Sequence, residues 1–105
     1  DFPVESPNPF YGIHAAVTRR RADGSPGPEG WRPEQRLTVE QAVLAYTRGA
    51  AFAAGREADL GSIRAGNRAD LTVLERDIFS MDPHEIRNAG VAATIVGGVL
   101  EHSVI

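Results

Sequence analysis

Five side chains stand out as candidates for acid–base or metal chemistry: Asp1, Glu5, His14, His84 and His102. Asp1 and Glu5 lie in a proline-rich opening segment, where a carboxylate is most simply a solvated turn residue. A metal or catalytic role for Asp1 stays open, because carboxylates also bind metal ions and accept protons. No two histidines have the His-x-His or His-x-x-x-His spacing of paired metal ligands. The residues alone therefore do not form a complete active site.

The three histidines are each expected to have an ordinary structural role. His14 falls on the apolar face of a predicted helix, which favours a packed, hydrogen-bonded core histidine. His84 lies in a helix-capping turn and His102 at the end of a predicted strand, so both are expected at the surface. The run Arg19–Arg21 is most simply a solvated helix end, where positive charge suits the helix dipole.

Composition excludes several kinds of chemistry. All 11 basic residues are arginines, so Schiff-base lysines and metal-bridging carboxylated lysines are absent. There is no cysteine, which excludes disulfides and thiolate sites. With a net charge of −3, a nucleic-acid partner is not expected. A hydrophobic content of 42% and a charged content of 24% are typical of a globular domain.

The ends of the chain and its apolar runs also bear on where the protein is located and on whether it belongs to a longer protein. No run approaches the roughly 20 apolar residues that cross a bilayer, so no membrane partner is expected. The opening residues show no signal peptide, and we expect a cytoplasmic protein. Because the first residue is Asp and not Met, we expect an internal piece of a longer protein.

Capping residues predict two helices. Asn8 as N-cap with Pro9 after it predicts a helix over residues 10–21. The pair Thr38 and Gln41 forms a capping box and Gly55 a stop, which together predict a helix over residues 38–54. Its buried stripe is expected to include Val39, Ala42, Val43, Tyr46, Ala50 and Ala53. Between the helices, residues 22–37 form a Gly- and Pro-rich loop, in which Trp31 is expected to pack against an apolar neighbour.

The second half of the chain has strand-like patterns. Apolar runs on both sides of Gly66-Asn67 predict a hairpin over residues 60–74. Gly97-Gly98 predicts a second hairpin, with strands at 92–96 and 99–102. Between them, Asp82 as N-cap before Pro83 predicts a short helical turn. The order of elements predicts the α+β class.

A series of short motifs resembles the C-terminal part of the amidohydrolase superfamily, in the branch that contains the N-substituted formamide deformylases. The motifs are DFPV at 1–4, NPFYGI at 8–13, AVTR at 16–19, LTVEQA at 37–42, YTRGAA at 46–51, GSIRAGNRADL at 61–71 and TIVGGV at 94–99. Each is weak alone, but the ordered set is specific. The family usually has Lys where Asn67 stands.

The resemblance implies a fold larger than this chain. Family members have a (β/α)8 barrel and a small β-sandwich built from strands at both chain termini. Residues 1–55 would be the C-terminal end of the barrel, as a loop plus two helices, and residues 56–105 the C-terminal part of the β-sandwich. The chain is thus expected to be an α+β fragment whose strands lack their usual partners. Such exposed strands favour a homo-oligomer.

The resemblance also implies an activity. Asp1 matches the aspartate at the end of the last barrel strand, which would bind the metal and take a proton from the attacking water. The full-length protein would then be a metal-dependent hydrolase of C–N bonds in small amide-type substrates, with Zn²⁺ as the expected divalent ion. The other ligands would precede Asp1, so the fragment alone is expected to bind no metal and to be inactive. A free-standing α+β interaction module without catalysis is the alternative.

Overall fold

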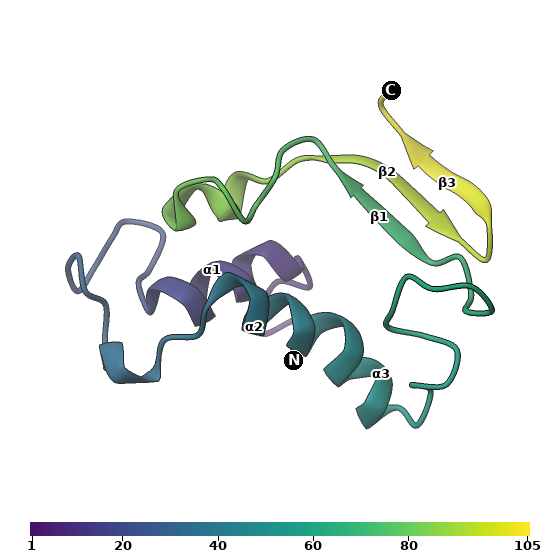
Figure 1. Ribbon diagram of the computed structural model, residues 1–105. Coiled ribbons are helices and arrows are strands. Elements are labelled where there is room, and N and C mark those ends of the chain that lie inside the picture. The colour runs from purple at the N-terminus through teal and green to yellow at the C-terminus, as the bar shows by residue number, and fades with distance from the viewer. The chain divides into compact units, whose positions relative to one another are not determined.

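Helices fill the first half of the chain, and the second half contains three strands and one 3-10 helix, which confirms the predicted α+β class. The computed structural model describes residues 1–105. Its elements, shown in Figure 1, are α1 (Pro9–Thr18), η1 (Pro33–Gln35), α2 (Val39–Leu44), η2 (Ala45–Gly49), α3 (Ala50–Ala53), β1 (Leu71–Leu74), η3 (Pro83–Asn88), β2 (Val91–Val96) and β3 (Val99–Ser103).

The chain divides into two compact units whose segments alternate along the sequence. The first unit contains residues 1–43 and 78–89, and the second contains residues 44–77 and 90–105. Each unit is therefore closed by contacts between segments that are distant in sequence. The predicted assignment of residues 1–55 to a barrel and residues 56–105 to a sandwich concerns a larger protein and stays a prediction.

Helix α1 begins as predicted but ends earlier. The Asn8 side chain accepts a hydrogen bond from the Phe10 N–H at 2.9 Å, with Pro9 as the first helical residue. Arg19 adopts a left-handed conformation (φ +54°), and its N–H bonds the carbonyl of Ala15 at 2.9 Å. This left-handed cap turns the chain out of the helix after Thr18. The predicted extension of the helix to Arg21 is therefore wrong.

The core of the first unit forms where α1 packs against the 3-10 helix η3. Phe10 and Ile13 from α1 are buried, as are Ile78 and Ile86 from the later segment. The predicted cap of η3 is confirmed, because the Asp82 carboxylate accepts a hydrogen bond from the His84 N–H at 2.9 Å. These contacts fix residues 78–89 beside the first helix of the chain.

The second predicted helix forms between the predicted cap and the predicted stop. The capping box is present, with Thr38 N–H to Gln41 Oε1 at 2.9 Å and Gln41 N–H to Thr38 Oγ1 at 3.1 Å. Gly55 follows with a φ of +69°. The consecutive helices α2, η2 and α3 cover Val39–Ala53, and η2 is a π-helical turn.

The buried positions of this helical run follow the predicted stripe only in its first part. Ala42 is buried as predicted, but Ala51 is buried in place of Ala50 and Ala53, which are exposed. The intervening turn η2 is wider than an α-helical turn, so the residues after it no longer follow the α-helical period.

The three strands form one antiparallel sheet in the order β1-β2-β3, as Figure 1 shows. The second predicted hairpin is confirmed: β2 and β3 pair around Gly97 and Gly98, whose φ values are +57° and +82°. The register shifts between Val73 and Leu74 in the β1–β2 pair and between Thr94 and Ile95 in the β2–β3 pair. Each shift marks a β-bulge or a comparable irregularity.

The predicted hairpin over residues 60–74 is wrong in its first half. Only the second run becomes a strand, β1, and it pairs with β2. The first run forms turns that lie on the helical segment of the same unit. A side chain at Gly61 (φ +86°) would come within 2.8 Å of Ala51 Cβ, so this close approach requires glycine.

Trp31 also differs from its prediction. Its side chain is 57% exposed, so it is not packed into the apolar core. The guanidinium groups of Arg19 and Arg32 each lie 5.0 Å from the ring centroid, and the Trp31 N–H bonds the Arg19 carbonyl at 2.9 Å. The ring is thus held by cation–π contacts and backbone bonding.

None of the helices is long and apolar enough to cross a membrane.

Replacing Ile86 with alanine should destabilise the first unit strongly, because Ile86 is 0% exposed. The loss of a fully packed isoleucine side chain should cost about 2–5 kcal/mol of unfolding free energy. Urea denaturation followed by circular dichroism measures this. Ile63→Ala is the matched control, since Ile63 is 89% exposed and should change stability little. Equal effects of the two substitutions would contradict the packing.

Candidate functional site

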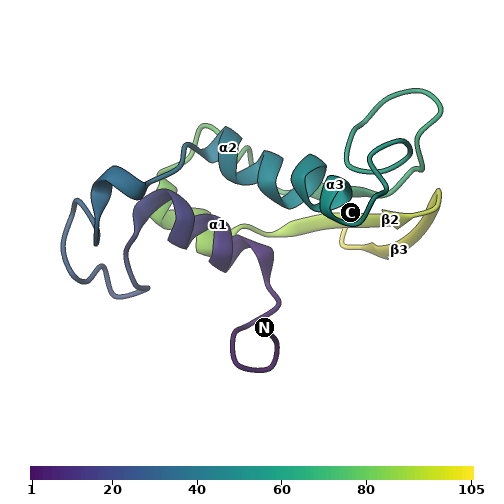
Figure 2. The ribbon, with the colours of Figure 1, turned by 90° about the horizontal axis from the view of Figure 1, so that it is seen from below.

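Asp1, the main predicted site residue, lies in the loop before α1, where Figure 2 marks the N-terminus. Its main-chain carbonyl accepts hydrogen bonds from the N–H groups of Val4 at 2.8 Å and Glu5 at 3.3 Å. The side chains of Asp1 and Glu5 are exposed. Across the whole chain, no three His, Cys, Asp or Glu side chains are grouped so that they could hold a metal ion. These 105 residues therefore do not by themselves fit the metal that the resemblance implies.

Two of the five candidate residues meet. Helix α1 and η3 bring His14 Nε2 within 3.3 Å of His84 Nδ1, and the ring centroids are 5.3 Å apart. His14 is 0% exposed, which confirms the predicted core histidine. The prediction that His84 lies at the surface is wrong, since η3 packs on α1 and leaves His84 half-buried. His102 is exposed on β3, as predicted.

Thr18 indicates which ring nitrogen carries the proton. Its hydroxyl donates to the His14 carbonyl at 2.8 Å and lies 3.4 Å from His14 Nε2. With its own proton used in this way, the hydroxyl can only accept from the ring. A proton on His14 Nε2 would then satisfy both Thr18 and His84 Nδ1, an assignment inferred from the hydrogen-bond geometry. His14 Nδ1 remains buried without a partner.

The surroundings of His14 favour its neutral form. Burial is the main cause that lowers the pKa of His14, and the positive charge of Arg87, His84 and Arg20 lowers it further. Arg87 is held nearby with its guanidinium 4.2 Å from the Tyr11 ring centroid. No carboxylate contributes to the shift. An imidazole pair among arginines is a poor site for a metal cation, so the pair serves packing between α1 and η3.

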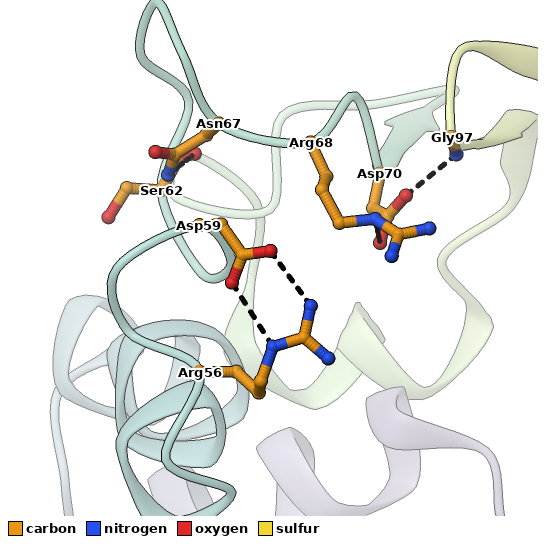
Figure 3. A network of polar contacts seen from close by, with 7 residues as sticks. All are labelled: Arg56, Asp59, Ser62, Asn67, Arg68, Asp70 and Gly97. Carbon is orange, nitrogen blue, oxygen red and sulfur yellow. Dashed lines mark hydrogen bonds and ion pairs between the residues drawn. The ribbon is translucent and has the colours of Figure 1, made fainter.

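The motif at residues 61–71, which is the most specific part of the resemblance, is held by polar contacts (Figure 3). Just before it, Arg56 forms a bidentate pair with Asp59, at 3.2 Å and 2.8 Å. Within it, the Asn67 amide donates to the Ser62 carbonyl at 3.0 Å. The Asn67 side-chain oxygen also accepts from Arg64 Nε at 3.2 Å. Asn67 thus holds the turn together.

The end of the same motif is tied to the sheet. Asp70 Oδ1 accepts a hydrogen bond from the Gly97 N–H at 2.7 Å, and Arg68 Nε lies 4.0 Å from the other Asp70 oxygen (Figure 3). The Gly98 N–H bonds the carbonyl of Ala69 at 2.9 Å. The residues before β1 therefore support the β2–β3 turn. Sequence reasoning missed these contacts because Asp70 and Gly97 are far apart in the chain.

The stability of the chain should fall as the pH is lowered through the ordinary histidine pKa of 6.5. Folding lowers the pKa of His14, so the unfolded chain binds the proton more readily, and stability is lost as pH falls. Urea unfolding midpoints measured from about pH 8 to about pH 5 test this. His14→Gln should flatten the dependence, whereas His102→Gln should leave it as in the unmodified chain. An unchanged pH slope in His14→Gln would contradict the assignment.

Comparison with known proteins places the chain in a family. Residues 1–101 match the model of the Amidohydrolase family. The chain is 34% identical to the YtcJ protein of Bacillus subtilis over 93% of its own length and 18% of the relative's. It is 36% identical to N-substituted formamide deformylase of Arthrobacter pascens over 97% of its length and 18% of the relative's.

A plant relative, protein LONG AFTER FAR-RED 3 of Arabidopsis thaliana, is 37% identical over 93% of the chain and 16% of its own length. The matched part is thus less than a fifth of each of these relatives. No solved structure matches the chain. The family resemblance seen in the motifs is confirmed by a match that covers nearly the whole sequence: the chain belongs to the Amidohydrolase family.

Proposed function

We propose that the chain is the C-terminal part of a larger metal-dependent hydrolase that cleaves C–N bonds in small amide-type molecules. The family match over residues 1–101 is the observation that carries this proposal. The short share of each relative that the chain covers supports a larger protein, and one relative is named for the deformylation of N-substituted formamides. A free-standing interaction module is not favoured, because the match to an enzyme family takes in both units.

In this proposal Asp1 is the catalytic and metal-binding residue of the chain. Its carboxylate is exposed and forms no ion pair, so both oxygens are available. When bound, a divalent ion, Zn²⁺ in this proposal, supplies Lewis acidity toward a water molecule. Zinc in catalytic sites takes about three protein ligands, so the other ligands would come from residues outside this chain. The chain alone is expected to be inactive.

The proposal also assigns the two parts of the chain to the larger fold. Residues 1–55 would form the end of a (β/α)8 barrel, as a loop plus helices, and residues 56–105 would supply strands to a β-sandwich. The three-stranded sheet supports this in one respect: β1 and β3 each pair with β2 alone, so each has one edge that a further strand could occupy. Substitution of Asp1 tests the proposed catalytic role, and the association state of the chain tests the proposed open strand edges.

In the larger protein, Asp1→Asn should lower kcat for amide hydrolysis by about a hundredfold or more, since a proton acceptor and a metal ligand are lost together. The metal content, measured by atomic absorption, should fall as well. Glu29→Gln is a control for loss of an exposed carboxylate in the same unit and should leave both quantities unchanged. Full activity of Asp1→Asn, or a start codon directly before Asp1 in the gene, would sink this assignment.

We also propose that the chain, made alone, forms a homo-oligomer through its exposed strand edges, because an unpaired edge can bond a strand of a second copy. Analytical ultracentrifugation over a range of concentrations should show association. Replacing Leu100 on β3 by proline removes a backbone donor from this strand and should reduce association. The β3 side chains are exposed, so little packing is lost. A monomer at all concentrations would count against the proposal.

A further inference from the structure

A cavity of about 570 Å³ lies beside the end of α1, within the first unit. Three consecutive arginines line it, together with Ser25, Pro26 and Trp31. The loop folds back over the arginines: the Arg21 N–H bonds the Ser25 carbonyl at 2.9 Å, and the Trp31 N–H bonds the Arg19 carbonyl at 2.9 Å. A side chain at Gly30 (φ +81°) would lie 2.9 Å from Arg19 Cβ, so glycine is needed for this approach.

The arginines of this cavity carry uncompensated positive charge. No carboxylate forms an ion pair with Arg19, Arg20 or Arg21. Arg19 is occupied on one side, since its Nε donates to the Trp31 carbonyl at 3.1 Å and its guanidinium lies over the ring. Arg20 Nε is buried and has no hydrogen-bond partner. A buried donor of this kind is uncommon in folded proteins, and its acceptor is missing.

The acid that follows these arginines in the chain, Asp23, is engaged in a hydrogen bond of its own. The Asp23 carboxylate accepts a hydrogen bond from the Ser25 N–H at 2.9 Å. Hydrogen bonding by Ser25 is the main cause that lowers the pKa of Asp23, and the charge of Arg21 adds to the shift. Asp23 does not line the cavity. The positive charge is therefore left without a counter-ion in a chain whose net charge is −3.

We propose that this cavity binds a small organic oxyanion, a phosphate or carboxylate attached to an apolar or aromatic group. Arg20 and Arg21 donate to the oxyanion, as guanidinium groups do with high preference. The apolar group lies against Pro26 and Trp31. The cavity volume is within the roughly 300–1,000 Å³ usual for small-molecule sites and is larger than a bare phosphate requires. This site is independent of Asp1 and of the hydrolase proposal.

Phenyl phosphate is a suitable probe, with phenol as the same ring without the oxyanion. Trp31 is the only tryptophan, so its indole N–H gives a single NMR signal that reports on the cavity. Titration of the 105-residue chain with phenyl phosphate should shift this signal saturably, and phenol should bind at least about tenfold more weakly. The proposal would be overturned if the indole signal showed no saturable shift, or if phenol bound as tightly as phenyl phosphate.

Substitutions separate a specific site from general charge attraction. Arg20→Gln should weaken phenyl phosphate binding by about tenfold or more. Arg76→Gln removes the same charge from an exposed position in the second unit and should leave binding unchanged. Arg21→Gln should also weaken phenyl phosphate binding. Because Arg21 is exposed, this variant replaces Arg20→Gln in the test if Arg20→Gln fails to fold. The proposed site would be overturned if Arg76→Gln weakened phenyl phosphate binding as much as the cavity variants do. It would also be overturned if the larger protein did not bind phenyl phosphate.

Discussion

The packing of α1 against η3 is the contact on which the first unit depends. It joins residues 9–18 to residues 83–88 across most of the length of the sequence. Burial of Phe10, Ile13 and Ile86 drives it, and the paired imidazoles of His14 and His84 fill the polar part of the same contact. Residues 78–89 thus belong to the first unit, although the segments before and after them in the sequence belong to the second.

Local interactions are the part of this fold that could be predicted from the sequence. The caps at Asn8 and Asp82 and the capping box at Thr38 depend on residues two or three positions away, and all are present. The turn at Gly97-Gly98 is local in the same sense. Predictions failed where a distant contact decides the outcome. Examples are Gly61, which lies against Ala51, and His84, which is covered by α1.

The candidate site shows a different limit of prediction from the sequence. Asp1 is a candidate through the family resemblance alone, because nothing in its local sequence separates a metal ligand from a solvated carboxylate. Asp1 is exposed and is not grouped with further His, Asp or Glu side chains, so these residues do not form a metal site by themselves. By contrast, the motif at residues 61–71 has a structural role. Asn67 and Asp70 hold a turn and support the sheet.

The register shifts of the sheet bear on its solubility. The edge strand β1 has only four residues, and the edge strand β3 carries an extra residue, Glu101, that has no partner in its pairing with β2. A bulged strand twists away from the flat geometry that lets strands stack without end. Edges this short and irregular can accept one strand of matching twist but give a poor template for fibril growth. A short β1 and a bulged β3 are edges of the kind that disfavour stacking of strands without end.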